Sequence, residues 1–365
     1  MSKQPVLPLA AILLAASFSP ELIADDHHEE SVLAEVAATT PLVANTVPGN
    51  GDVNPYGVAF VPEGFPRGGP LRAGDILVSN FNNSTNLQGT GTTIVSIHRD
   101  GSQTLFFAGS PGLGLSTALG ILRDGFVLVG NVPSTDGSFS TIQQGSLLVL
   151  DSHGKIVTTL TSATLLDGPW DLAVDDDGGQ SHIFVSNVLS GTVTRLDVQT
   201  SGGHFKVVHM TQIGSGYAHR GDPAALAIGP TGLAFDEDSG LLYVAATGNN
   251  AIYAIHDSER AMHDQGTGTL VYTDAVHLRG PLGLALAPHG HLLTTNGDAI
   301  NPDPNNVQVS EMVEFTASGH FIAQLPVDAS APGGAFGIAL KGSGGRLILA
   351  AEDDVTNQLK VWTLH

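Results

Sequence analysis

The fold is decided by Pro230-Thr231-Gly232-Leu233-Ala234-Phe235, which is followed by Leu242-Tyr243-Val244-Ala245-Ala246 and then by Ala251-Ile252-Tyr253-Ala254-Ile255. Between the first two runs lies an acidic segment that ends in glycine and has the composition of a tight turn. Short apolar runs bounded by turn residues are typical of buried strands. The stretch therefore predicts three consecutive strands of one sheet.

The first run of this stretch recurs, with variations, six times along the chain. Its third position falls at Gly57, Gly120, Asp171, Gly232, Gly283 and Gly337, so that successive positions are 63, 51, 61, 51 and 54 residues apart. This period suits one four-stranded blade of a β-propeller with loops of variable length. We therefore predict an all-β, six-bladed β-propeller over residues 41–365.

The two ends of the predicted propeller complement each other. The sixth repeat runs out of chain after its third strand, Gln358 to Trp362, while an unassigned apolar segment, Leu42 to Val47, precedes the first repeat. Pairing these two segments would supply the missing fourth strand and remove an exposed sheet edge. We expect the N-terminal strand to close the last blade.

The N-terminal segment has the features of an export signal. Lys3 is followed by an apolar run from Val6 to Phe18, and the polar residues begin at Asp25. This order predicts a signal peptide over residues 1–24 and an acidic linker over residues 25–40, hence a secreted or periplasmic protein. The alternative is a disordered or helical N-terminal tail.

The overall composition narrows the classes of partner. Lys plus Arg number 14 against 35 Asp plus Glu, which gives a net charge of −21 that repels phosphate backbones and anionic lipids. No window approaches the roughly 20 apolar residues that a membrane-spanning helix needs. Cysteine is absent, so the chain has neither disulfides nor thiolate metal ligands. We expect a monomer that binds neither nucleic acid nor membrane.

The stretch from Pro230 to Ile255 resembles NHL-repeat propellers. The whole of residues 41–365 is more distantly similar to the SMP-30/gluconolactonase group of six-bladed propellers. This resemblance implies a fold more firmly than a function, because such propellers include hydrolases, lyases and binding proteins.

Propeller geometry brings the starts of the first strands and the ends of the second strands to one face, around a central channel. Polar residues at the second-strand ends are Asn80, Asn131, Asn187, Asn296 and Glu352, with Asn249 close to the fourth. Tyr56, Trp170 and Phe336 lie beside the repeated glycine, and a loop that includes Asp298 should overhang the same face. We predict ligand binding by Tyr56, Asn80, Trp170, Asn249, Asp298 and Phe336.

Amide and carboxylate oxygens are the ligands that calcium prefers. The similar enzymes hold a metal with Glu, Asn and Asp residues, which by analogy suggests Asn131, Asp171, Asn187, Asn296 and Glu352 here, with Asp171 and Glu352 in acid–base roles. The chain departs from that pattern at Gly57 and Val58, where the family would place a glutamate ligand. The competing interpretation is that the asparagines satisfy backbone groups at the strand ends.

Two functions follow from these alternatives. The first is a secreted propeller that binds a protein, glycan or small ligand at its channel mouth, and the second is a calcium-dependent lactonase or esterase that uses the same face. Whether the protein is an enzyme is left open, since no catalytic motif such as G-x-S-x-G occurs.

Overall fold

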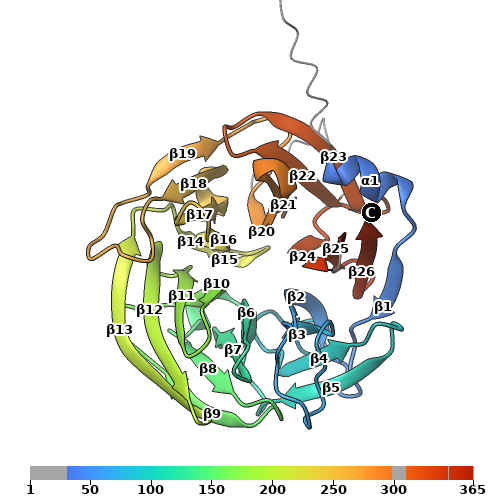
Figure 1. The fold of residues 1–365 in the computed structure, drawn as a ribbon. Coiled ribbons are helices and arrows are strands. Elements are labelled where there is room, and N and C mark those ends of the chain that lie inside the picture. Colours follow the sequence, from blue (N-terminus) through green and yellow to red (C-terminus); the bar gives the residue numbers. More distant parts are fainter. Residues whose placement is uncertain (1–30, 298–309, 344, 365) are drawn as a thin grey trace, which may run out of the picture. The chain divides into compact units, whose positions relative to one another are not determined.

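The computed structural model describes residues 31–297, 310–343 and 345–364 of the 365-residue chain. The predicted signal peptide, residues 25–30 of the predicted linker and Asp298 lie outside the described residues. Residues 31–365 form one compact unit, in which six four-stranded antiparallel sheets surround a central channel (Figure 1). The predicted six-bladed β-propeller is confirmed.

The blades follow one another along the chain, each running from the channel outwards. Blades one to three are β2 (Val53–Phe60), β3 (Ile76–Asn82), β4 (Thr93–Ile97), β5 (Gln103–Ala108); β6 (Leu115–Leu122), β7 (Phe126–Asn131), β8 (Ser146–Leu150), β9 (Ile156–Leu160); and β10 (Pro169–Asp176), β11 (Gln180–Asn187), β12 (Thr192–Ser201), β13 (His204–Gly214). Blades four to six are β16 (Pro230–Asp236), β17 (Leu241–Ala246), β18 (Ala251–Ile255), β19 (Thr269–Tyr272); β20 (Pro281–Ala287), β21 (His291–Asn296), β22 (Ser310–Thr316), β23 (Phe321–Asp328); and β24 (Ala335–Ser343), β25 (Arg346–Asp353), β26 (Gln358–Leu364), β1 (Leu42–Asn45).

Smaller elements lie between the blades or within their loops. They are helix α1 (Val32–Ala38), the short hairpin β14 (Arg220–Asp222) with β15 (Leu226–Ile228), and the 3-10 turns η1 (Phe139–Thr141), η2 (Thr247–Asn249) and η3 (Pro288–Gly290).

The core consists mainly of apolar layers between adjacent blades rather than one central mass. Between blades two and three, for example, Leu128 and Val149 pack with Ile183 and Val185, and all four are fully buried. A strand that lies between two neighbouring blades buries both faces, which explains why the second-strand runs are apolar without alternation.

The N-terminal strand closes the sixth blade, as the sequence predicts. Strand β1 pairs antiparallel with β26 in the register Leu42 with Val361 and Asn45 with Gln358. The hydroxyl and amide of Thr46 extend the pairing by donating to the Asn357 carbonyl, at 2.8 and 3.1 Å. This pairing covers what would otherwise be an open edge of blade six.

The second repeat lies two residues earlier than the sequence analysis placed it. In β6, Leu119 pairs with Val129, so Ala118 lies opposite Gly130, just as Gly57 lies opposite Ser79 in blade one. Ala118, not Gly120, is therefore the equivalent of the repeated glycine. The prediction was misled because Leu119-Gly120-Ile121 imitates the consensus while Ser116-Thr117-Ala118 does not.

Residues 31–40, which the sequence analysis assigned to the linker, include helix α1. Its apolar residues Val32, Leu33 and Val36 are buried against blades five and six, next to Trp362 and Met312 (Figure 1). Among the described residues, no helix is long and apolar enough to cross a membrane.

Candidate functional site at the channel mouth

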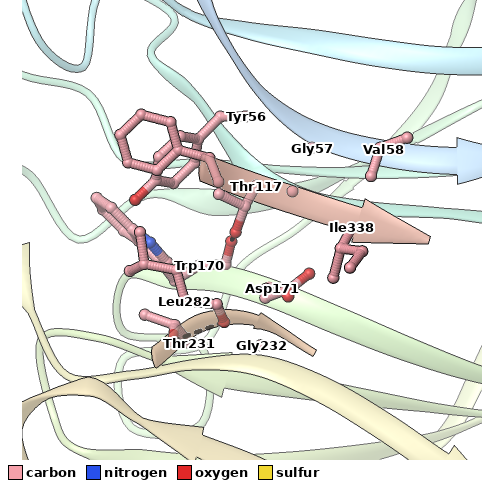
Figure 2. A pocket seen from close by; sticks show the side chains of 13 residues that line it. Tyr56, Gly57, Val58, Thr117, Trp170, Asp171, Thr231, Gly232, Leu282 and Ile338 are labelled. Atoms are coloured by element: carbon pink, nitrogen blue, oxygen red, sulfur yellow. Dashed lines mark hydrogen bonds between the residues drawn. The ribbon is translucent and has the colours of Figure 1, made fainter. Parts of the chain in front are cut away.

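The channel is narrowed by one residue from the inner strand of each blade. These residues, which we call the mouth ring, are Tyr56, Thr117, Trp170, Thr231, Leu282 and Phe336. They hold the blades together through their backbone carbonyls: Thr117 donates to the Trp170 carbonyl, and Thr231 donates to the Leu282 carbonyl at 3.1 Å (Figure 2). The space enclosed at this level is about 30 Å³, enough for about one water molecule.

The residue after each ring member lies against the carbonyl of the next ring member. A Cβ atom on Gly57 would approach the Thr117 carbonyl oxygen to 2.5 Å, and one on Gly337 would approach that of Tyr56 to 2.6 Å. Such contacts explain why glycine occupies these positions, since a methyl group on Gly57 or Gly337 would collide with a backbone carbonyl of the next blade.

Asp171 is the exception among these small residues. Its carboxylate points into the channel, toward Ile338 (Figure 2). Oδ1 accepts a 2.7 Å hydrogen bond from the backbone N–H of Leu172. Burial nevertheless raises the pKa of Asp171 to about 8. The predicted acid–base residue is thus a half-buried carboxylic acid in the channel.

Glu352 is a second carboxyl group beside the inner strand of blade six, and it is fully buried. Oε2 accepts a 3.2 Å hydrogen bond from the Gly337 N–H, whereas Oε1 has no hydrogen-bond partner among the described residues. Burial raises the pKa of Glu352 well above its ordinary value, and the nearby Asp354 and Asp171 act in the same direction. Burial also raises the pKa of Asp354, a residue that sequence reasoning missed, to about 6.

Glu352 does not occupy the position that the sequence analysis gave it. Asp353 pairs with Ala335 at the strand end, as Asn187 pairs with Pro169. Glu352 lies one residue earlier in its strand. At the equivalent position of blades one, three and five, the hydroxyl groups of Ser79, Ser186 and Thr295 accept a backbone N–H of the inner strand at 2.9–3.1 Å. Glu352 therefore replaces a hydroxyl that elsewhere fixes the inner strand, and it puts a buried carboxyl group next to Gly337, which lines the channel.

The asparagines at the strand ends face away from the channel. Each donates from Nδ2 to a backbone carbonyl in the segment that enters its own blade: Asn80 to Thr46 at 3.2 Å, Asn131 to Leu113 at 3.1 Å, Asn187 to Leu165 at 3.4 Å and Asn296 to His277 at 2.7 Å. Asn187 and Asn296 also accept backbone N–H groups, from Asp167 and Arg279. The structure therefore does not bring Asn131, Asn187 and Asn296 together with Asp171 and Glu352.

The other predicted ligand-binding residues divide into two groups. Tyr56, Trp170 and Phe336 form an aromatic cluster with Phe81, in which the Tyr56 ring lies 4.5 Å from that of Phe336 and 5.4 Å from that of Phe81. Asn249 lies outside it, exposed, with Oδ1 accepting the Ala218 N–H at 2.9 Å. Burial raises the pKa of the Tyr56 hydroxyl far above its ordinary value, so Tyr56 stays neutral.

Above the mouth ring lies a cavity of about 220 Å³, which we call the mouth pocket. Its walls are largely apolar, from Tyr56, Phe81, Leu282 and Phe336. Four polar side chains also line it: Asn54, Gln88, Thr231 and Thr247. Asn54 Oδ1 and Gln88 Oε1 are buried and have no hydrogen-bond partner among the described residues.

The hairpin β14–β15 forms part of the wall of the mouth pocket, through Ala224, Ala225 and Ala227. Gln88 Nε2 ties it to blade one by donating to the Ala224 carbonyl at 2.6 Å. Leu226, with a positive φ of 61°, is buried in the cluster that contains Tyr56 and Trp170. A leucine in the left-handed region is strained, so tertiary packing holds this hairpin in place.

Sequence reasoning missed Thr117, Asn54, Gln88 and the hairpin. The shifted second repeat concealed Thr117. Asn54 precedes the repeated phrase at the start of β2, and Gln88 lies in the β3–β4 loop, so no periodic signal marks them. The apolar run Leu226-Ala227-Ile228, directly before the fourth repeat, was the one indication of an extra element.

A separate acidic group lies at the opposite ends of the strands. Asp175, near the end of β10, has a carboxylate oxygen within 4.8 Å of those of Asp177 and Glu237, which lie in the β10–β11 and β16–β17 turns. Glu237 belongs to the acidic segment for which the sequence predicts a tight turn, and it lies between β16 and β17.

No protein-family model matches the chain, and no curated protein sequence matches it. Solved structures resemble its fold. A gluconolactonase of Xanthomonas campestris is 15% identical, with a TM-score of 0.54 over 91% of this chain and 93% of that one. The Malassezia sympodialis allergen Mala s 1 is 13% identical, with a TM-score of 0.56 over 88% and 96%.

A third similar structure is a regucalcin of Agrobacterium tumefaciens, described as a calcium-binding protein. It is 14% identical, with a TM-score of 0.50 over 87% of this chain and 92% of that one. The expected distant similarity to the SMP-30/gluconolactonase group is therefore confirmed at the level of the fold. Identities this low say nothing about activity.

Proposed function

We propose that this propeller is a binding protein whose mouth pocket takes a compact, largely apolar molecule that carries a hydroxyl or amine group. The observation that carries the proposal is the 220 Å³ cavity over the mouth ring, with aromatic walls and a few converging polar groups. Such a combination is the usual form of a small-molecule site. The volume is somewhat below the usual range of about 300–1,000 Å³, which favours a small ligand.

The polar groups of the mouth pocket favour a ligand that donates hydrogen bonds. The Thr247 hydroxyl lies 2.7 Å from the Pro281 carbonyl, so its proton is used within the protein. The oxygens of Asn54 and Gln88 are acceptors without partners. A buried acceptor that stays unpaired costs about 1–3 kcal/mol, which a ligand hydroxyl or amine would recover.

Binding can be tested with N-phenyl-1-naphthylamine, a neutral probe that has two aromatic parts and one N–H donor, and whose fluorescence rises in apolar surroundings. We expect saturable binding to the protein, and binding weakened by about tenfold or more in Ala225→Phe, because the new ring would fill the pocket. Ala317→Phe is the matched control, since Ala317 is exposed in the β22–β23 turn.

The hydrogen-bonding part of the proposal has its own comparison. The near-isosteric probe 1-benzylnaphthalene has a CH₂ group in place of the N–H group, so it should bind more weakly than the amine. Absence of saturable binding would contradict the assignment of the pocket. So would equal affinities of Ala225→Phe and Ala317→Phe for the amine.

A calcium-dependent lactonase or esterase is the second candidate, and the buried, unpartnered Glu352 Oε1 favours it. Asp354 and Asp171 are the acidic residues whose negative charges help to raise the pKa of Glu352. We place this function second because calcium takes 6–8 oxygen ligands and the predicted asparagines do not join these carboxyl groups. Its proton chemistry would rest on Asp171, whose raised pKa suits a general acid.

Calorimetry with calcium chloride separates the cases. Binding that is lost in Asp171→Asn/Glu352→Gln would support the second candidate and justify a screen of lactones and esters. Binding that is lost only in Asp177→Asn/Glu237→Gln would assign the ion to the acidic turns, and no binding at all would exclude the calcium enzyme. Export of the protein remains a prediction from its N-terminal sequence.

A further inference from the structure

Away from the mouth pocket, a cavity of about 380 Å³ lies between blades one and six. It lies where β2 and β4 end and where β25 begins, at the strand ends opposite the mouth. This is also the junction that the pairing of β1 with β26 completes. We call it the seam cavity.

The seam cavity exists because the layer between blades one and six is thin at its outer part. That layer is built largely from small and β-branched residues, with Ala44, Val78 and Ala350 among its buried members. At the preceding junction, between blades five and six, helix α1 adds Val32, Leu33 and other side chains to the layer. In the described part of the chain, no helix does the same for blades one and six.

The walls and the rim of the seam cavity differ in character. Phe60, Ile76, Ile348 and Val361 provide apolar surface inside it. Arg99, Lys341 and Arg346 line it as well, with His98 beside them. Three of the 14 Lys and Arg residues thus gather at one cavity in a chain of net charge −21, and none of the described residues that line it is acidic.

The two arginines are available to bind an anion. The Arg99 guanidinium packs on Gly74, where a Cβ atom would come within 2.6 Å of it, and it donates to the Ala73 carbonyl at 3.1 Å. These contacts fix the group while using one of its five donors. Arg346 makes no hydrogen bond or ion pair among the described residues, whereas Lys341 lies 3.4 Å from the exposed Glu63.

We propose that the seam cavity binds a single-chain amphiphile with a carboxylate head, such as a medium-chain fatty acid. The hydrocarbon tail of the ligand would lie on the apolar wall made by Ile76, Ile348 and Val361. The volume of the cavity falls within the range of about 300–1,000 Å³ that is usual for small-molecule sites. The head would pair with Arg99 and Arg346, whose planar guanidinium groups match a carboxylate. The negative charge of the rest of the protein makes a free amphiphile a better match than an anionic membrane surface.

The test is calorimetric titration with decanoate, below its micellar concentration, at moderate salt. We expect saturable binding with one molecule per chain, weakened by about tenfold or more in Arg99→Gln/Arg346→Gln. The matched control is Lys155→Gln/Lys206→Gln, which changes the net charge equally at two exposed positions away from the cavity and should bind like the wild type. Both substituted arginines lie at the surface, so the variant should fold.

Three further arms isolate the chemistry and the location. Decan-1-ol, which has the tail without the charge, and butyrate, which has the charge with a short tail, should each bind far more weakly. The Ala225→Phe variant should bind decanoate normally, since it alters only the mouth pocket. The proposal fails if decanoate does not bind, if both double variants lose affinity equally, if decan-1-ol binds as well as decanoate, or if Ala225→Phe abolishes binding.

Discussion

Two glutamates on neighbouring blades are equally buried and differently used. Glu314 in blade five accepts hydrogen bonds from the Ser31 hydroxyl at 2.7 Å, the Val32 and Leu33 N–H groups at 3.0 and 2.9 Å, and His291 Nδ1 at 2.8 Å. Glu352 in blade six accepts one N–H, from Gly337 at 3.2 Å. The first carboxylate fastens helix α1 to the propeller, whereas the second has a buried oxygen without a hydrogen-bond partner among the described residues.

This contrast teaches how to separate structural from functional acids in a repeat fold. When a buried carboxylate is surrounded by hydrogen-bond donors, these donors offset the free energy lost by removing it from water. Such a carboxylate has a structural role. A buried carboxyl group with few donors is held protonated instead, and it remains available to a ligand, an ion or a proton.

The largest expected effect comes from exchanging each glutamate for glutamine. Glu314→Gln should lose about 3–5 kcal/mol of unfolding free energy, because it breaks a buried pair with His291 and misplaces an NH₂ group against two N–H donors. Glu352→Gln, the matched change, should be neutral or slightly stabilising, because a neutral amide replaces a group that burial already disfavours as an anion. Urea denaturation measures both, and equal losses would remove the distinction.

The pH dependence of stability sharpens the same contrast. Burial raises the pKa of Asp171 to about 8 and that of Asp354 to about 6, and it also raises the pKa of Glu352. The folded protein therefore binds more protons than the unfolded chain above about pH 4, and its stability should fall as the pH rises from about 4 to 8.

Asp171→Asn should remove part of this fall, on the order of 2 kcal/mol between pH 5 and pH 8. Thermal unfolding at several pH values measures the effect. If the wild type and the variant show the same slope, the channel carboxyl group does not carry the raised pKa.

The smallest expected effect concerns the attachment of helix α1. Ser31 is its N-cap, accepting the Ala34 N–H at 3.1 Å while its hydroxyl donates to Glu314. Ser31→Ala should cost about 1 kcal/mol in the wild type. In the Glu314→Gln background the loss should be smaller, because part of it belongs to the Ser31–Glu314 contact. Additive losses would show that the two residues act independently.

The architecture could be predicted because it is repeated. Six copies of an apolar phrase and one unpaired strand at each end determine a closed ring, since inner strands must bury both faces and edges must be paired. Single deviations from the repeat were harder. Leu119-Gly120 imitated the consensus two residues late, and Glu352 was aligned one residue away from its structural equivalents, so both the ring member Thr117 and the orientation of Glu352 were missed.

The candidate site was predicted only where it follows the repeat. Tyr56, Trp170, Asp171 and Phe336 belong to inner strands and were placed at the mouth in advance. Asn54, Gln88 and the β14–β15 hairpin meet only in the folded protein, through contacts such as that of Gln88 with Ala224 across 136 residues. The amide side chains at the strand ends carried no information about calcium, because the same residue type is also the common partner of backbone groups at turns.

The most direct test is whether a ligand occupies the mouth pocket, whose wall residue Phe81 packs on Trp170. The chain has two tryptophans, and in Trp362→Phe only Trp170, beneath the mouth pocket and 5.4 Å from the Phe81 ring, remains to transfer energy to bound N-phenyl-1-naphthylamine. The account predicts that nearly all Trp170 emission is lost as the probe saturates the protein. If more than half of that emission survives at saturation, the probe binds elsewhere and the mouth pocket is not the ligand site.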